Sequence, residues 1–139
     1  MEMKSGDFAK AWGGVAGVQS TLSVLLDRGY HYSDQSLEGR QLPLDRISSL
    51  IATEPARRFR IPGKGSIAVG MDADLTLVDL SRSSQLRPEH LMQRHPMSNP
   101  YLGFTFRGNV ERTIRRGETI FASGKITARG PGKFVRPVR

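Results

Sequence analysis

Apolar residues in the first half of the chain recur with the period of an α-helix. Two sets carry this spacing: Val18, Leu22, Leu25 and Leu26, and then Leu44, Ile47, Leu50 and Ile51. The first set predicts a helix that Gly29 ends as a left-handed cap. The second set predicts a helix that has Pro43 in its first turn and ends at Pro55.

After residue 65 the spacing is mostly that of strands. A β-branched run, a turn at Gly70 and an apolar run over residues 75–80 follow one another, and the last run places apolar side chains on both faces of a strand. Residues 81–99 are polar and predict a loop with one helical turn, and Gly108 predicts a turn. Residues 110–114 and 118–121 predict a hairpin, and the tail from residue 128 predicts an extended or loosely ordered segment.

Composition sets the broad class. The chain has 139 residues, 37% of them hydrophobic, and a mean hydropathy of −0.38. This length favours one domain, and no apolar run approaches the roughly 18 residues of a membrane span. The first residues lack the pattern of a signal peptide, so we expect a cytoplasmic protein with no membrane partner. The absence of cysteine excludes disulfides, thiol catalysis and thiolate metal sites.

The chain is basic, with a formal net charge of +8 and a sequence pI near 10.6. The basic residues fall into three separate groups, each next to a turn or a chain end: Arg57, Arg58 and Arg60; Arg112, Arg115 and Arg116; Lys125, Arg129, Lys133, Arg136 and Arg139. Few aromatic residues accompany them and no nucleic-acid motif is present. The groups therefore predict solvated surface or protein contact, and no nucleic-acid partner.

Residue types that bind anions or metals occur without the required spacing. Glycines precede the first helix in Trp12-Gly13-Gly14-Val15-Ala16-Gly17, where backbone N–H groups can approach a ligand. The spacing is not that of a phosphate-binding loop. Residues that can bind metal are scattered: His31, Asp34, Glu38, His90 and His95. None forms a convergent set with ligand spacing, so we predict no metal ligand and no catalytic residue in this chain.

Several segments together resemble the cyclic amidohydrolases, the group that contains allantoinase, dihydroorotase, hydantoinase and dihydropyrimidinase. The segments are Gly65-x-Ile67-x-x-Gly70-x-Asp72-Ala73-Asp74-Leu75, Asn99-Pro100-Tyr101-x-Gly103, Arg116-Gly117-x-x-Ile120-Phe121-x-x-Gly124 and Thr53-x-Pro55-Ala56-Arg57-x-Phe59. The first looks like a strand pair that leads from the family's barrel into a small β domain. Residues 8–22 are most similar to the allantoinase branch, and the resemblance covers nearly the entire chain.

The resemblance implies a hydrolase that opens a cyclic amide, with allantoin converted to allantoate in purine catabolism as the first reading. It also implies a pair of divalent metal ions, usually zinc, that activate a bridging hydroxide. Specificity for a hydantoin, a dihydropyrimidine or dihydroorotate is an alternative, and a stand-alone binding or interaction module is a second one. The family's metal ligands have no match in this sequence, which corresponds to the region after the last ligand. We therefore expect no cofactor bound by this chain and no activity from it alone.

The fold implied is an α/β fragment in two parts. Residues 1–61 correspond to the end of a TIM barrel with its last outer helices, and residues 62–139 to the C-terminal strands of the small β domain with a basic tail. By position in the family, the resemblance implies that Gly13, Gly14 and Gly17 contact the substrate ring, with a purely structural turn as the alternative. In the family, the barrel and the other strands of the β domain, which pack against these two parts, come from other regions of the protein. We therefore expect association with the missing barrel portion, with a complementary chain, or with further copies as a homo-oligomer.

Overall fold

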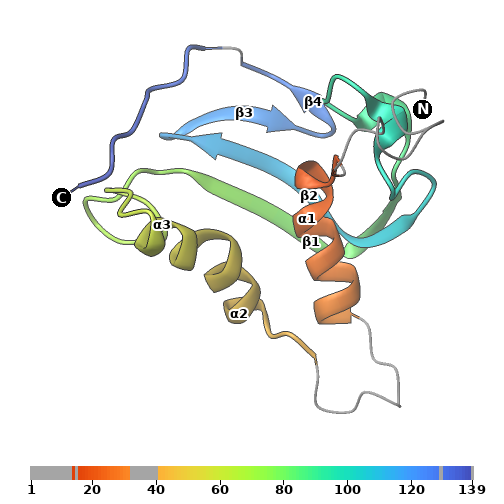
Figure 1. Cartoon of the computed structure of the whole chain (residues 1–139), viewed down its shortest axis with the longest axis horizontal. Helices are drawn as coiled ribbons and strands as arrows, with labels where there is room; N and C mark the ends of the chain where they lie inside the picture. Colours follow the sequence, from red (N-terminus) through yellow and green to blue (C-terminus); the bar gives the residue numbers. More distant parts are fainter. Residues whose placement is uncertain (1–13, 15, 32–40, 129, 139) are drawn as a thin grey trace.

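The computed structural model describes residues 14, 16–31, 41–128 and 130–138, and in this part the chain forms two helices followed by a sheet (Figure 1). The first helix starts with a 3₁₀ turn, Val18–Ser20, and continues as α1 (Thr21–Val24) and a π-helical stretch, Leu25–His31. The second consists of α2 (Leu44–Ser48), a π-helical stretch, Ser49–Thr53, and α3 (Glu54–Arg58). None of the helices in the described residues is long and apolar enough to cross a membrane.

Four antiparallel strands form one sheet in the order of the chain. They are β1 (Leu75–Gln85), β2 (Thr105–Arg115), β3 (Glu118–Ala122) and β4 (Lys125–Ile126). The connection between β1 and β2 contains two 3₁₀ turns, Pro88–His90 and Pro96–Ser98. Each later strand therefore pairs with the one before it, and β1 stands at the edge of the described sheet.

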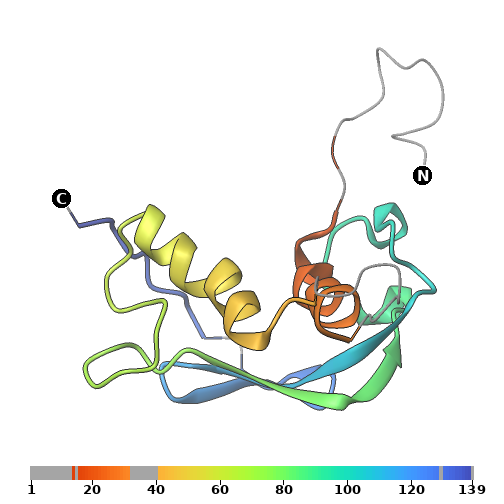
Figure 2. The same cartoon turned by 90° about the horizontal axis from the view of Figure 1, so that it is seen from below.

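Both helices lie on the same side of the sheet (Figure 2). The first helix packs on β2: Leu26 lies against Gly108, and the Asp27 carboxylate accepts a hydrogen bond of 3.0 Å from the Arg107 N–H. The hydrophobic residues that are buried in the described part are few: Leu26, Ile47, Ala56, Leu91 and Phe106. The core is therefore a thin layer between the helices, the sheet and the β1–β2 connection.

The predicted hairpin is confirmed. Arg115 pairs with Glu118, and the two residues between them, Arg116 and Gly117, have φ angles of 48° and 85°. Positive φ at both central positions is the type I′ geometry, whose twist matches that of antiparallel strands. Ser123 and Gly124 repeat this conformation between β3 and β4. The described part of the tail is extended, as predicted, and the Val138 N–H reaches the Arg60 carbonyl at 3.0 Å.

Gly29 does not end the first helix, so that prediction is wrong. The residue lies inside the π-helical stretch Leu25–His31 without a positive φ. Its carbonyl accepts a hydrogen bond from the Leu42 N–H at 2.9 Å, and a Cβ at this position would come within 3.0 Å of Leu42 Cδ1. The glycine therefore allows the chain to return close to the helix, and it is not a cap.

Pro55 does not end the second helix either. It occupies the first turn of α3, directly after the π-helical stretch Ser49–Thr53. A wider π-helical turn changes the hydrogen-bond partners of the backbone, and this accommodates the proline ring inside a continuous helix. Thr53 bonds outside the helix: its hydroxyl donates to the Gly65 carbonyl at 2.7 Å.

Three expectations for the second half are also corrected. Residues 81–85 belong to β1, whereas the sequence predicted a loop from Ser81 onward. The first member of the expected strand pair is absent from the described sheet, because Ile67 and Val69 are 88% and 107% exposed and no strand lies beside them. A strand requires a paired neighbour. Gly108 lies inside β2 and is not a turn.

Gly108 instead marks an irregularity in the β1–β2 pair. Asp79 pairs with Asn109 and Ser83 with Arg107, so three residues of β1 face one residue of β2. Gly108 has a φ of 92° there, and the first helix covers it. The Asp79 carboxylate accepts hydrogen bonds from the Ser81 N–H, the Ser81 hydroxyl and the Arg82 N–H, which replace ladder bonds in the bulged strand. These bonds, the Ser81 hydroxyl first, lower the pKa of Asp79.

Candidate functional site

The predicted substrate-contact glycines stand at the start of the first helix. Gly14 is exposed with a φ of 90°, and among the described residues beyond its chain neighbours no atom lies within 4 Å of the place a Cβ would occupy. Gly17 is half-buried, and its carbonyl accepts hydrogen bonds from the Ser20 N–H at 3.0 Å and the Thr21 hydroxyl at 3.3 Å. Gly13 lies outside the described residues. Substrate contact by these three glycines stays a prediction.

Gln19 connects the helix start to the connection between β1 and β2. Its Nε2 donates to the His90 carbonyl at 2.8 Å, and its Oε1 accepts from the Met92 N–H at 2.8 Å. The donor and the acceptor of the side-chain amide therefore both bond to one short stretch of backbone, in the way that a residue of a neighbouring strand does. Leu91, which lies between these two contact points, is buried in the core.

Ser20 and Asn99 make a second link beside it. They are 2% and 4% exposed, and Asn99 Nδ2 donates to Ser20 Oγ at 3.2 Å. Asn99 Oδ1 accepts from the Tyr101 N–H at 2.9 Å, so both ends of this buried amide are used. Since a buried polar group without a partner is costly, the pair fixes the connection against the helix start.

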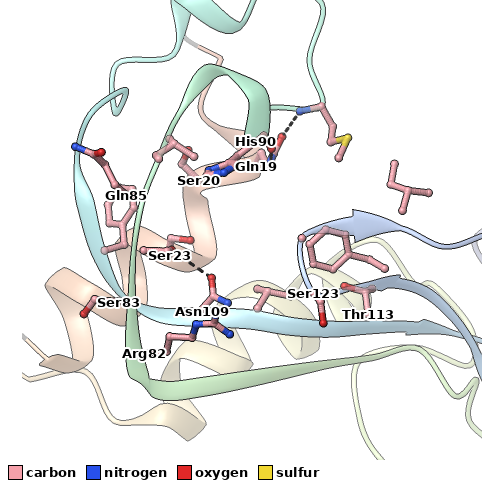
Figure 3. Close-up of a pocket in the computed structure, with 18 of the residues that line it drawn as sticks. Gln19, Ser20, Ser23, Arg82, Ser83, Gln85, His90, Asn109, Thr113 and Ser123 are labelled. Atoms are coloured by element: carbon pink, nitrogen blue, oxygen red, sulfur yellow. Dashed lines mark hydrogen bonds between the residues drawn. The ribbon is translucent and has the colours of Figure 1, made fainter.

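A groove of about 950 Å³ lies beside the Gln19–His90 and Ser20–Asn99 hydrogen bonds (Figure 3). The start of the first helix forms one wall with Gln19, Ser20 and Ser23, and the strands form the floor. The remaining lining residues come from β1, β2, β3, β4 and the segments between and after them: Arg82, Ser83, Ser84, Gln85, Leu86, His90, Met92, Phe106, Asn109, Val110, Thr113, Ile120, Phe121, Ser123, Gly124, Ile126 and Ala128. Gly14 and Gly17 are not among them.

The groove is lined by hydrogen-bonded polar side chains and by apolar side chains. Its polar floor is tied together by hydrogen bonds: Ser84 Oγ donates to Asn109 Oδ1 at 3.2 Å, and Asn109 Nδ2 donates to Glu111 Oε1 at 2.8 Å. Arg82 Nη1 lies 2.9 Å from the same Glu111 oxygen. Within the described lining there is one histidine and no carboxylate, so a pair of carboxylates or a hydroxyl with its base and acid is not formed there.

The described residues also contain no group of three or more histidine and acidic side chains placed to hold a metal ion. His90 lines the groove, whereas His31 and His95 do not. Asp34 and Glu38 lie outside the described part of the chain. A divalent metal therefore does not fit the donor set in these residues.

One charged cluster was not predicted from the sequence. Lys64 Nζ lies 2.7 Å from Asp72 Oδ2 and also donates to Asp74 Oδ2. Asp74 Oδ1 in turn accepts from the Arg116 N–H at 2.7 Å, so the cluster holds residues 64–74 to the β2–β3 hairpin. The hydrogen bond from Lys64 lowers the pKa of Asp74, and the bonds to Asp72 and then Asp74 raise the pKa of Lys64. These carboxylates therefore act as structural ties.

Sequence reasoning missed three polar residues that join the helix start to the rest of the molecule: Gln19, Ser20 and Asn99. A signal for each was present, because all three fall in the segments that resemble the cyclic amidohydrolases. Spacing alone does not reveal their roles, since their contacts join residues that are 71 to 79 positions apart.

The fold and these segments define a class of protein. The family model described as "Amidohydrolase family" matches residues 7–120, and the chain belongs to this family. Allantoinase from Solibacter usitatus is 54% identical over 136 residues, which are 97% of this chain and 28% of that protein. D-phenylhydantoinase from Escherichia coli O1:K1 is 36% identical over 98% of this chain and 28% of its own length.

Solved structures agree with this class. L-hydantoinase (dihydropyrimidinase) from Arthrobacter aurescens has a TM-score of 0.78 and 30% identity, covering 94% of this chain and 28% of the other. The chain thus has an amidohydrolase-family fold with structural neighbours of the hydantoinase type, and its sequence is allantoinase-like. It spans about 28% of the length of the curated relatives named here.

Proposed function

We propose that this chain is the C-terminal part of a cyclic amide hydrolase that opens allantoin to allantoate in purine catabolism. The observation that supports allantoin is the identity of 54% to an allantoinase over 97% of the chain, against 36% to D-phenylhydantoinase over a similar span. Specificity for a hydantoin, a dihydropyrimidine or dihydroorotate is the second candidate, and the hydantoinase-type structural neighbours favour it.

In this proposal residues 1–61 supply the last helices outside a (β/α)₈ barrel, and residues 62–139 supply strands of the small β domain. The exposed apolar residues support such missing neighbours: Val18 on the first helix, Leu50 and Ile51 on the second, and Ile67 and Val69 before β1. Apolar surface of this kind usually marks an interface. The remaining part of the enzyme is the first partner, and association of the enzyme as a cytoplasmic homo-oligomer is included in the proposal.

Gly13, Gly14 and Gly17 present backbone groups to the substrate ring in the proposed enzyme. The exposure of Gly14 and its positive φ support this, because a glycine without a side chain lets a ligand approach the backbone closely. The family's divalent metal, usually zinc, does not fit the described residues, so its ligands belong to the rest of the enzyme. The contribution of this chain is then to bind and orient the substrate.

A domain graft tests the proposal. The chain replaces the matching segment of the Solibacter usitatus allantoinase in one host and that of the Escherichia coli D-phenylhydantoinase in another. We expect the first graft to release allantoate from allantoin and the second to hydrolyse no hydantoin, because this chain supplies the glycine wall of an allantoin site. The isolated chain is expected to show neither activity.

Each host with its own segment restored by the same cloning steps is the matched control. Both grafts are loaded with zinc and checked for folding before assay. A folded, metal-loaded allantoinase graft that is silent on allantoin overturns the first candidate. Hydantoin hydrolysis by the second graft favours the alternative specificity.

A further inference from the structure

We propose that Gln19 is a positioning residue for the glycines that precede the first helix. It would set the place of Gly17, and through it Gly14, by tying the helix start to the backbone of His90 and Met92 in the β1–β2 connection. This inference rests on the proposed function, because it gives Gln19 and the backbone of His90 and Met92 a role in the affinity for the substrate. Gln19 can act on substrate affinity in this way without itself contacting the substrate.

The geometry of the Gln19 amide carries the inference. Both of its polar atoms are engaged at 2.8 Å, one as donor to the His90 carbonyl and one as acceptor from the Met92 N–H (Figure 3). Two bonds from one planar group fix its direction as well as its distance. Rotation of the helix start would break both bonds together.

The neighbouring contacts transmit this position to the glycine segment. Gly17 is bonded through its carbonyl to Ser20 and Thr21, so it moves with the first helical turn. Ser20 is held by the buried Asn99, which fixes that turn from a second direction. The turn from Gly17 to Ser20 is thus held in place by a connection more than 70 residues later in the chain.

Small shifts of a substrate-contacting backbone have large effects on binding. A substrate hydrogen bond that is weakened by about 1.4 kcal/mol lowers the affinity about tenfold. A shift that weakens substrate and transition-state binding equally raises KM and leaves kcat unchanged. Loss of the Gln19 bonds should therefore show in KM.

The test compares two glutamine variants of the allantoinase graft. Gln19→Met keeps the size of the side chain and removes both bonds. Gln93→Met is the control, because Gln93 Nε2 donates to the His95 carbonyl at 3.0 Å within the same connection and does not reach the helix. We expect Gln19→Met to raise KM for allantoin about tenfold with kcat within about twofold, and Gln93→Met to change neither by more than about twofold.

A second variant removes the bond from the other side. Met92→Pro lacks the N–H that Gln19 accepts, and Leu91 already has the extended conformation required before proline, with φ −90° and ψ 121°. We expect its KM to rise as well, and the double variant to be no worse than Gln19→Met, because both changes delete a shared interaction. Equal KM values for Gln19→Met and Gln93→Met, or a loss in kcat and melting temperature alone, overturn the inference.

Amide hydrogen exchange separates this inference from the proposed function. In the same grafts, we expect Gln19→Met to speed exchange in the peptide that covers residues 14–21 by about tenfold, and Gln93→Met to leave it unchanged. Faster exchange in a graft without allantoin turnover would support the positioning role while the proposed function fails. Unchanged exchange in an active graft would overturn the positioning role while the function stands.

Discussion

The first helix and the β2–β3–β4 hairpins obtain their structure in different ways. The hairpins are local: two residues connect each pair of strands, and both turns have the positive φ angles that the strand twist requires. The first helix is placed by bonds to residues 71 to 80 positions away, made by Gln19, Ser20 and Asp27. Local turns therefore define the β2–β3–β4 hairpins, whereas long-range contacts define where the helix lies.

Glycines elsewhere in the chain show the same contrast between local and long-range requirements. Gly70 and Gly117 have positive φ angles, and a Cβ on either would meet no atom within 4 Å. Gly65 and Gly108 have positive φ angles too, but each is also pressed against a helix. The first two are required by conformation alone, and the other two by conformation and by space. Substitution by alanine separates these requirements.

Gly65→Ala should have the largest effect. The new Cβ would lie 2.8 Å from Ala56 Cβ and 3.3 Å from the Ala52 carbonyl oxygen, both on the second helix, and φ is 95°. We expect the free energy of unfolding to fall by about 3 kcal/mol, from backbone strain and overpacking together. Urea unfolding followed by far-UV circular dichroism at fixed protein concentration measures it.

Gly70→Ala is the matched control for Gly65→Ala. It carries the same kind of backbone strain with φ 89° and open space around it, so a loss of only about 1 kcal/mol is expected. Equal losses in the two variants would mean that the contact with the second helix contributes nothing.

Gly108→Ala should come next. Its Cβ would meet Leu26 Cβ and Cδ1 at 3.1 Å; Cδ1 can rotate away, whereas Cβ moves only with the helix, by a few tenths of an ångström. We expect a loss of about 2 kcal/mol in the same unfolding measurement, with faster amide exchange in residues 21–31, because the first helix is pushed from β2. In Gly117→Ala, which adds strain at a hairpin turn alone, exchange in the helix should stay unchanged. Faster amide exchange in residues 21–31 of both Gly108→Ala and Gly117→Ala would contradict this prediction.

These contacts also explain which features the sequence predicted. The hairpin at Arg116 and Gly117 depends on a two-residue turn between apolar runs, and such local information is present in the order of residues. Both helices have the expected apolar spacing. Their ends were misjudged at Gly29 and Pro55, because the packing of Leu42 and a π-helical turn override the usual meaning of glycine and proline.

The site was predicted less well than the fold. The resemblance pointed to the glycines, but periodicity does not predict a pair such as Gln19 and His90, whose contact depends on how the β1–β2 connection folds back.

The strand expected at Ile67 and Val69 did not form for the opposite reason: its residues suit a strand, and no neighbour in the described sheet pairs with them. Local preference predicts an element, and a partner decides whether it forms.

The smallest effect is expected at the tie between residues 64–74 and the hairpin. Because Lys64 lowers the pKa of Asp74 from its ordinary value of 3.8, this pair contributes stability above that pH, and the contribution is lost as the pH falls through the lower value of the folded state. Because the two carboxylates raise the pKa of Lys64 above 10.5, the contribution of Lys64 is full below that pH and is lost as the pH rises through the higher folded value. The pair is partly exposed, so we expect it to contribute no more than about 1 kcal/mol to the free energy of unfolding.

Urea titrations at a series of pH values measure this contribution. Lys64→Met should weaken the loss of stability at both low and high pH, whereas Lys125→Met, at an exposed position of β4, should preserve it. Identical profiles for the two variants would show that Lys64 adds nothing to the bonds that remain, from the Gly117 N–H to the Ala73 carbonyl at 3.0 Å and from the Arg116 N–H to Asp74 Oδ1 at 2.7 Å.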